Sequence, residues 1–532
     1  MMSGLLVVLL APVLGALAVG LAGARWTPRV GALVGVVVSL VSLAAVLVVW
    51  FTRSPEESFA GEVDHVWIEA LSVHWHLGVD GASVPLVCLT AVLSALCCAW
   101  LAGEPTSLAD VSRGDTQAGP STHALLALVL VVEAASIGVF VALDLLLFFV
   151  FFELALVPMW FVIAWWGDPH DEAGRRQAAT RFLLFTVTGS ALMLVGFVGL
   201  AARTGTLQIP ELATLAPGIT GTFELALAGA IALGLAVKTP IWPLHIWLPD
   251  AHASAPTVGS VLLAGVFLKL GTYGFIRILV PVLPEPTARL APYLAGFAVV
   301  GIVYSALACL RQRDLKRLIA YSSVGHMGFV VLGIATLNES GMAAAIFASV
   351  AHGVITGLLF FLAGAIKDRH GTAVLARLGH GMYTRAPWLA VAFGFGCLAS
   401  LGVPGLAGFW GELLALRGAY EAGLDGGVLS RATAWTVLGV AAVGIALTTA
   451  YFTGLMRRLL QGDPAAAEPV TAAGTATATA TATAVAAATD LDRREAVVVG
   501  VLVLATVLLG LLPLVLTAPI GEALPWLLGG GR

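Results

Sequence analysis

The chain alternates between long apolar segments and short polar ones. A helix that crosses a bilayer needs about 20 mostly apolar residues, and about fourteen segments of the sequence meet this requirement. They lie near residues 4–23, 30–52, 81–103, 122–141, 143–166, 180–202, 222–247, 256–282, 290–310, 317–337, 341–366, 386–416, 433–456 and 496–518. The pattern predicts an all-α, polytopic membrane protein. The first segment has no basic region before it and no obvious cleavage site, so we interpret it as a retained span.

The charges between the spans predict the topology. The connections that follow odd-numbered spans carry Arg25, Arg29, Arg113, Arg175, Arg176, Arg181, Arg311, Arg313, Lys316, Arg317, Lys367, Arg369, Arg377, Arg385, Arg457, Arg458, Arg493 and Arg494. The even connections and the C-terminal end carry only Arg53, Arg203, Arg277, Arg289, Arg417, Arg431 and Arg532. Because cytoplasmic loops are enriched in Lys and Arg, both termini are predicted on the outer side of the membrane. The Ala/Thr-rich segment 464–489 is then a flexible cytoplasmic connector.

The amino-acid composition limits the classes of function that the chain can have. Hydrophobic residues make up 59% of the 532 residues and charged residues 11%, against about 25% charged in a soluble domain. The net charge is −4, so no nucleic-acid partner is indicated. None of the cysteines, which are Cys88, Cys97, Cys98, Cys309 and Cys397, belongs to a C-x-x-C motif. A locally held iron–sulfur cluster or haem is therefore not expected.

Ionisable residues lie at membrane depth, where each costs about 2.5–3.5 kcal/mol on insertion scales. The main candidates are Glu153, Lys238, Lys269, His326, His352 and Glu412, and secondary candidates are Glu133, Asp144 and His245. A single Lys–Glu pair or a lone histidine in a bundle is often structural. Titratable groups on several different helices instead favour a proton path, because each group in such a path must accept and release a proton.

Two of the charged spans contain helix-breaking residues. Pro240 and Pro243 follow Lys238, and Pro404 with several glycines precedes Glu412. Proline removes a backbone donor, and non-helical backbone at this depth is tolerated only against protein or a wet cavity. The two breaks, in spans 7 and 12, are five spans apart. This odd spacing predicts inverted five-helix repeats, spans 4–8 and 9–13, although two unrelated Pro-containing helices would look the same.

The predicted inverted repeats divide the chain into five regions. The predicted regions are an N-terminal three-helix region (1–121), a first repeat (122–282), a second repeat (283–460), the connector (461–495) and a C-terminal transmembrane helix (496–532).

One long motif has a specific resemblance. The segment VKTPIWPLHIWLPDAHASAPTVGSVLLAGVFLKLGTYG resembles the signature of the proton-conducting, antiporter-like membrane subunits of respiratory complex I. IGVFVALDLLLFFVFFELALVPMWF, DLKRLIAYSSVGHMGF and PGLAGFWGELLAL extend the resemblance, which covers roughly residues 75–460. The family implies fourteen core helices, inverted repeats and broken helices 7 and 12.

The resemblance also implies roles for single residues. Glu153 and Lys238 would form an acid–lysine pair, Lys269 would lie mid-membrane, and His326 or His352 would link it to Glu412. Glu412 on helix 12 implies that the chain resembles the M-type members of the family, because the sibling subunits usually carry lysine at this position. The Ala/Thr-rich connector departs from the family pattern, and the Ala-, Gly- and Val-rich composition suits a bacterial chain.

The chain carries no Rossmann glycine fingerprint or flavin motif. We therefore expect no cofactor on it, with NADH, FMN, iron–sulfur clusters and quinone in partner subunits. The resemblance predicts a multi-pass, proton-translocating subunit of NADH–quinone oxidoreductase in the bacterial inner membrane, bound by lipid and by neighbouring antiporter-like subunits. Three alternatives stay open: a subunit of a multisubunit Na+/H+ antiporter, a membrane subunit of an energy-converting hydrogenase, and a scaffold whose charges are structural.

Overall fold

The computed structural model describes residues 2–54, 57–103, 121–215, 218, 221–424, 426–462 and 489–529. Arg113, Arg532 and nearly all of the predicted Ala/Thr-rich connector lie outside the described residues.

Twelve helices of the described residues are long and apolar enough to cross a membrane. They are α1 (Met2–Ala22), α2 (Pro28–Phe51), α3 (Val84–Leu101), α4 (Thr122–Val141), the consecutive α5 (Leu145–Leu154) and α6 (Leu156–Trp166), α7 (Glu172–Thr204), the continuous run α11 to α13 (Thr257–Val282), α14 (Pro284–Arg311), α15 (Leu315–Ala335), α16 (Glu339–His370), α20 (Arg431–Leu460) and α22 (Arg493–Leu511). The predicted all-α membrane fold is confirmed.

The other two predicted spans are each split into two shorter helices. In span 7, α9 (Thr222–Lys238) ends at the lysine, and helix resumes only at α10 (Leu248–Ser254). In span 12, α18 (Pro387–Ser400) and α19 (Ala407–Glu421) flank six non-helical residues. The predicted proline positions, Pro240, Pro243 and Pro404, all fall in these interruptions. If each of these two interrupted segments is counted as one span, the total equals the predicted fourteen spans. This total is an interpretation, because the two segments are not continuous helices.

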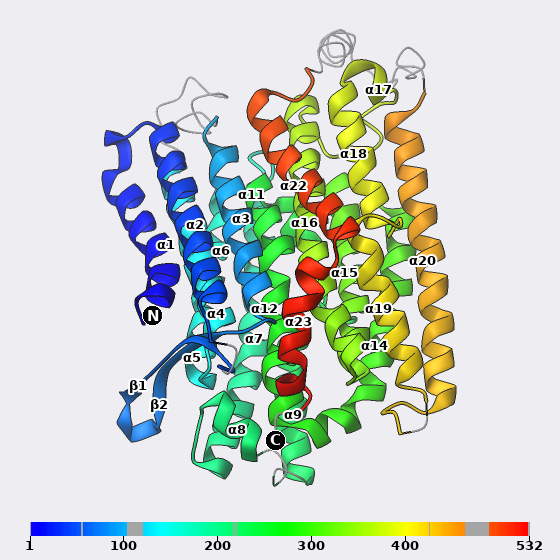
Figure 1. Cartoon of the computed structure of the whole chain (residues 1–532). Helices are drawn as coiled ribbons and strands as arrows, with labels where there is room; N and C mark the ends of the chain where they lie inside the picture. Colours follow the sequence, from blue (N-terminus) through cyan, green and yellow to red (C-terminus); the bar gives the residue numbers. More distant parts are fainter. Residues whose placement is uncertain are drawn as a thin grey trace.

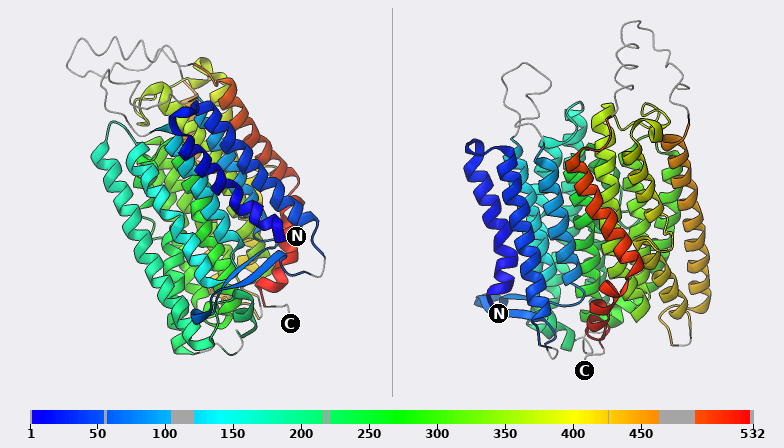
Figure 2. Two further views of the ribbon diagram at one scale, coloured as in Figure 1. Left: turned by 90° about the vertical axis from the view of Figure 1, so that its left-hand side faces the viewer. Right: turned by 45° about the horizontal axis from the view of Figure 1, so that its top comes forward.

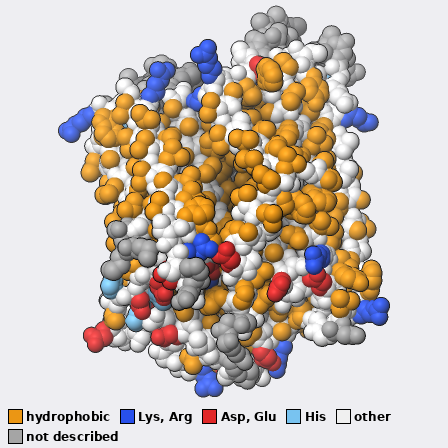
Figure 3. All heavy atoms as spheres, viewed as in Figure 1, with side chains coloured by type: hydrophobic (Ala, Val, Ile, Leu, Met, Phe, Trp, Pro, Cys, Tyr) orange, Lys and Arg blue, Asp and Glu red, His pale blue; other side chains and the backbone are white. Residues whose placement is uncertain are grey.

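The helices stand side by side in one bundle (Figures 1 and 2). The N- and C-terminal ends are both at the lower end in Figure 1, as is α8 (Ile209–Leu215), whereas α17 (Met382–Arg385) lies at the upper end. Figure 3 shows an apolar band around the middle, with charged side chains gathered towards the two ends. Apolar side chains of α7 such as Leu184 and Val195 are also more than half exposed, as is typical of a surface that meets lipid.

A β-hairpin lies between α2 and α3, where only a connection between two spans was predicted. Strands β1 (Ala60–Ile68) and β2 (Val73–Val79) pair antiparallel at the lower end of the bundle (Figure 1). The segment VHWH alternates apolar and polar residues, which is the period of a strand, and VDHVWI is rich in the β-branched and aromatic residues that favour strands. Cross-strand contacts join His74 Nδ1 to Asp64 at 2.6 Å and His76 Nε2 to Glu62 at 2.7 Å. The hairpin is not visible in the hydropathy pattern of spanning helices, because its strands are much shorter than the about 20 residues of such a helix.

The C-terminal region also differs from the single predicted helix. α22 ends at Leu511, and a separate helix, α23 (Leu514–Leu527), follows after Leu512 and Pro513. Because proline has no backbone N–H, the α22 ladder cannot continue through Pro513.

Arg277 corrects one detail of the charge count. It was assigned to a connection, but its side chain is fully buried in a π turn (Phe275–Leu279). Its Nη2 donates to Asp80 at 2.5 Å, and its Nε donates to the Tyr273 hydroxyl at 2.9 Å. Trp526 of α23 covers the guanidinium at 4.9 Å. This pair therefore joins the segment between β2 and α3, the π turn and the C-terminal helix. Without Arg277, the even connections carry fewer cations still.

We expect Arg277→Met to destabilise the fold by about 3–5 kcal/mol, because it leaves the buried Asp80 carboxylate without its partner. The measurement is the amount of chain that is extracted from membranes in a folded state, together with its thermal midpoint. Combining Arg277→Met with Asp80→Leu should recover much of the loss, since replacing both members of a buried ion pair is often near neutral. Equal losses in the single and double variants would contradict this explanation.

One set of backbone contacts occurs twice in the chain, at opposite ends of the bundle. Asp144 caps α5, and the neighbouring Leu145 N donates to Leu207 O at 2.9 Å next to α8. Asp314 caps α15, and Leu315 N donates to Ala373 O at 2.9 Å ahead of α17. Both caps open the second helix of a predicted repeat.

Candidate functional site

Lys269 lies at the centre of the buried polar groups. It belongs to α12 (Leu268–Gly274), which is fully buried between two π turns. In the first of these turns, Leu263–Phe267, the Leu268 amide donates to Leu263 O instead of Ala264 O. The Lys269 Nζ donates to the Ala264 carbonyl at 2.5 Å. The π turn thus supplies a backbone oxygen to the Lys269 amino group, which forms no ion pair with a carboxylate in the part of the chain that the structure describes.

His352 of α16 is the second partner of Lys269. Its Nδ1 lies 2.6 Å from the Lys269 Nζ, while its Nε2 has no hydrogen-bond partner among the described residues. At this separation one proton lies between the two nitrogens, held by either the amine or the imidazole. A proton can therefore pass between Lys269 Nζ and His352 Nδ1 without movement of the backbone.

His326 of α15, which is partly buried, continues this sequence of groups. Its ring centroid lies 5.7 Å from that of His352. Its Nδ1 lies 2.7 Å from Ser322 O, and its Nε2 lies 2.9 Å from Ser400 O and 3.3 Å from Ser400 Oγ. Both ring nitrogens thus face a backbone carbonyl oxygen.

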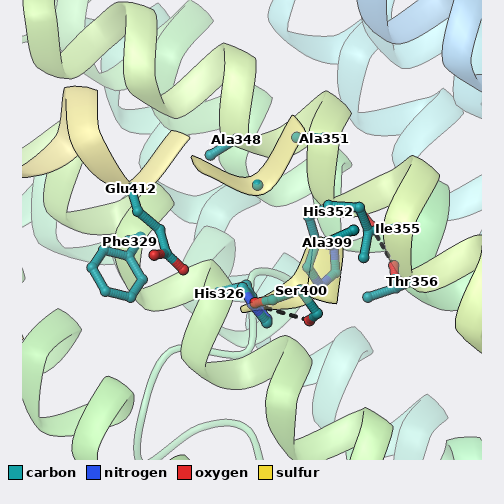
Figure 4. A pocket seen from close by; sticks show the side chains of 11 residues that line it. His326, Phe329, Ala348, Ala351, His352, Ile355, Thr356, Ala399, Ser400 and Glu412 are labelled. Atoms are coloured by element: carbon teal, nitrogen blue, oxygen red, sulfur yellow. Dashed lines mark hydrogen bonds between the residues drawn. The ribbon is translucent and has the colours of Figure 1, made fainter. Parts of the chain in front are cut away.

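A cavity separates the histidines from Glu412. Its volume holds about one water molecule. Figure 4 shows the Glu412 carboxylate pointing into it from one side, with His326, Ser400 and His352 on the other. The apolar part of the lining includes Phe329, Ala348, Ala351, Ile355 and Ala399. A single bridging water would connect the carboxylate with the imidazoles.

The break in span 12 shapes the Glu412 side of this cavity. Gly402 has a φ of +68°, and a Cβ there would approach Glu412 Oε2 to 2.7 Å. Only glycine combines this backbone conformation with such a close carboxylate. Gly402, one of the glycines that the sequence places before Glu412, therefore makes room for its side chain.

Lys238 and Glu153 form a separate part of the site. The Lys238 Nζ lies between the rings of Phe152 and Phe267, 4.3 and 4.2 Å from their centroids. It has no hydrogen-bond partner among the described residues, and neither has Glu153 Oε1. The implied acid–lysine pair is therefore not in contact here, although the two groups are close enough to interact electrostatically. Cation–π contacts take the place of the ion pair.

The secondary candidates lie outside this sequence of groups. Glu133 accepts a hydrogen bond from Ser39 of α2 at 2.6 Å. Asp144 caps α5 and accepts from Leu146 N, Leu147 N and His74 N. His245 lies in the span 7 break, with its ring 5.2 Å from that of Tyr304. Asp144 is thus explained by helix capping.

Sequence reasoning missed two residues of this region. His252 of α10 is fully buried, neither ring nitrogen has a partner among the described residues, and it stacks on Phe360 at 4.6 Å. It lies in the quoted WLPDAHA segment, which could have drawn attention to it. Ser400 offered no such signal, because its importance depends on the fold.

Comparison with known proteins decides the family. A family model described as NADH:quinone oxidoreductase/Mrp antiporter, TM, matches residues 142–439, more than half of the chain. The chain belongs to this family. The predicted resemblance is therefore confirmed, and the match covers Glu153, Lys238, Lys269, His326, His352 and Glu412.

Relatives within the NADH:quinone oxidoreductase/Mrp antiporter family are similar along most of the chain. NADH-quinone oxidoreductase subunit M of Rhodobacter capsulatus is 37% identical over 511 residues, which cover 94% of this chain and 89% of the relative. NAD(P)H-quinone oxidoreductase chain 4 1 of Synechococcus sp. (strain JA-3-3Ab) is 39% identical, over 75% of this chain and 71% of the relative. The similarity to M-type subunits agrees with the prediction made from Glu412.

Solved structures show the same fold. A chain of respiratory complex I from Thermus thermophilus with bound NADH aligns with a TM-score of 0.80 and 28% identity, covering 98% of this chain and 100% of that one. A chain of the Mrp complex from Dietzia sp. DQ12-45-1b aligns with a TM-score of 0.79 over 98% and 97% of the two chains, at 21% identity. The Mrp likeness concerns the fold alone.

Proposed function

We propose that this chain is a proton-translocating membrane subunit of an NADH–quinone oxidoreductase, driven by electron transfer from NADH to quinone in other subunits. The observation that carries the proposal is the succession of Lys269 and His352, which are buried, and of His326 and Glu412, which are partly buried and line the same cavity. These groups come from α12, α16, α15 and α19, and nothing in the packing of a plain scaffold requires titratable groups there.

The central step is a proton transfer between Lys269 and His352. With the proton on Lys269, the ammonium donates to the unprotonated Nδ1, and the imidazole carries its own proton on Nε2. Transfer breaks the Nζ–H bond and forms the Nδ1–H bond, which leaves a neutral amine and an imidazolium. The imidazolium then carries a proton on Nε2 that no group among the described residues holds.

Lys238 would control this transfer by its charge. It contacts Phe267, the last residue of the π turn that holds the Lys269 Nζ. A positive charge on Lys238 disfavours a second positive charge nearby, since Coulomb interactions are strong where water is excluded. If Glu153 approaches Lys238, its carboxylate offsets this charge, and Lys269 can then be loaded with a proton.

We expect Lys238→Met to lower NADH-driven proton uptake by about tenfold or more, because Met fills the space between the two rings without a charge. The measurement is proton uptake by inside-out vesicles, normalised to assembled complex. Arg176→Ala is the matched control, since it removes an exposed cation whose only ion pair among the described residues is with Glu172 in the same helix. Uptake equal to that of the unaltered chain would refute the role of Lys238.

The partner assignments follow from the family. The relatives are named as subunits of larger oxidoreductases, which supports neighbouring membrane subunits as partners, the antiporter-like ones above all. NADH, FMN, iron–sulfur clusters and quinone are assigned to partner subunits of the complex, without a choice among them. The described residues hold no group of three or more His, Cys, Asp or Glu arranged for a metal ion.

The membrane orientation rests on the distribution of charge. We place the chain in the bacterial inner membrane, with both termini outside and the Ala/Thr-rich connector in the cytoplasm. The two termini lie at the same end of the bundle (Figure 2), as this orientation requires. The region boundaries 1–121, 122–282, 283–460, 461–495 and 496–532 are part of the same proposal, and the paired Asp144 and Asp314 caps support the inverted repeats.

Purifying the tagged chain from native membranes would test the assembly. We expect NADH–quinone oxidoreductase subunits to co-purify with it, and the preparation to oxidise NADH. Recovery of Na+/H+ antiporter or hydrogenase subunits instead would favour one of those alternatives. The relatives that share 37–39% identity are oxidoreductase subunits, whereas the Mrp likeness is at 21%, so the oxidoreductase is preferred.

A further inference from the structure

The surroundings of His326 are unusual in their hydrogen-bonding capacity. Ser322 O faces Nδ1 and Ser400 O faces Nε2, so both ring nitrogens have an acceptor within hydrogen-bond distance. A neutral imidazole carries one N–H, and its other nitrogen is an acceptor. Two carbonyl oxygens therefore match only the imidazolium, and the neutral ring needs a donor at one of its nitrogens.

The Ser400 hydroxyl supplies that donor, so the donor and the acceptor for Nε2 belong to the same residue. Its hydroxyl oxygen lies 3.3 Å from Nε2, beside its own carbonyl oxygen at 2.9 Å. A hydroxyl rotates freely between donating and accepting positions. Ser400 is also 98% buried, so bulk water does not compete for the ring along this direction.

The break in span 12 explains why the Ser400 carbonyl is available. Ser400 is the last residue of α18, and the residue four positions later is Pro404, which has no N–H to donate. The next amides donate elsewhere, Leu401 N to Cys397 O and Gly402 N to Ala399 O. The carbonyl end of a helix also favours a positive charge. The interrupted helix thus presents an acceptor suited to a charged His326.

We propose that Ser400 is a positioning residue for proton transfer at His326, with its hydroxyl donating to Nε2 of the neutral ring and its carbonyl accepting from Nε2–H of the imidazolium. This inference rests on the proposed function, because it assumes that His326 changes its protonation state during turnover. The inference adds Ser400 of span 12 to the proton path. The Ser400 hydroxyl acts when the His326 ring is neutral, and the Ser400 carbonyl acts when the ring is charged.

The proton balance is simple. In the neutral state the ring proton is on Nδ1 and is donated to Ser322 O. A proton delivered through the cavity, from His352 or from Glu412, forms a new Nε2–H bond as the donor loses its own bond to hydrogen. The Ser400 hydroxyl turns away, and Nε2–H points to the Ser400 carbonyl. Departure of the proton to the opposite side of the cavity reverses these changes.

Three variants in the assembled complex test the inference. Ser400→Ala removes the donor for the neutral ring, and we expect NADH-driven proton uptake to fall by about tenfold. Ser400→Thr keeps a hydroxyl on the same atom and should restore uptake to within about twofold. Ser323→Ala is the matched control, since this buried hydroxyl on α15 donates to Ile319 O and touches neither histidine.

A second substitution separates positioning from packing. In a His326→Gln background, Ser400→Ala should cause no further loss, because the ring on which it acts is gone. An additional loss there, or full uptake in Ser400→Ala alone, would overturn the role of Ser400. Full uptake in His326→Gln alone would instead contradict the proposed function of the path, so the two failures are distinguishable.

Discussion

Replacing Lys269 by Met is expected to reduce NADH-driven proton uptake by about a hundredfold per assembled complex. The Lys269 Nζ is the only cation in contact with the histidines among the described residues, and its 2.6 Å contact with His352 Nδ1 is where a proton changes hands. Met has a similar length and no titratable group, so the bundle should still pack. The measurement is proton uptake by inside-out vesicles, with the amount of complex determined on native gels.

Lys269→Arg provides a sharper form of the same test. Arginine keeps the positive charge but does not release its proton in proteins. If Lys269 transfers protons, the Arg variant should be as defective as the Met variant in the complex that assembles. Uptake close to normal with Arg would show that only the charge matters, and would remove Lys269 from the path.

Glu412 is expected to show the second largest effect. Glu412→Gln keeps the size and the hydrogen-bonding groups but removes titration, so proton uptake should be lost. Glu412→Lys keeps a titratable group beside Gly402 and should retain part of the uptake, in line with the lysine that sibling subunits usually carry. The Glu412 carboxylate faces the same cavity as His326 and His352, so a titratable group at this position completes the proton path.

A structural role for Glu412 would give the opposite result. As a fixed negative charge it would tolerate Gln and reject Lys, because a wrong-signed buried charge costs several kcal/mol. Proton uptake for each variant, normalised to assembled complex, distinguishes the two roles. A mild Gln variant with a severe Lys variant would withdraw Glu412 from the path.

Much of the fold could be predicted because lipid imposes simple rules. The long apolar segments had to be helices, since a spanning backbone must satisfy its own hydrogen bonds. Pro240, Pro243 and Pro404 marked the two interruptions because proline acts locally, whatever the tertiary context. Lys269 and Glu412 were equally visible in the sequence, since a charge within an apolar span is costly and needs an explanation.

Contacts between distant helices could not be predicted in this way. Arg277 was assigned to a connection because its partner, Asp80, lies far away in the sequence and only the fold brings them together. The separation of Lys238 from Glu153 also depends on where Phe152 and Phe267 place their rings. Ser400 is a common residue in an apolar span, and its relation to His326 follows from helix packing alone.

The most direct test of the central claim changes both histidines at once. His326→Gln with His352→Gln keeps hydrogen-bonding side chains between Lys269 and Glu412 but removes every titratable group there. The measurement is the initial rate of NADH-driven proton uptake by the purified, intact complex in liposomes. The account predicts rapid uptake with the unaltered chain and a loss of at least about tenfold in the double variant. Equal uptake by the two complexes would contradict it.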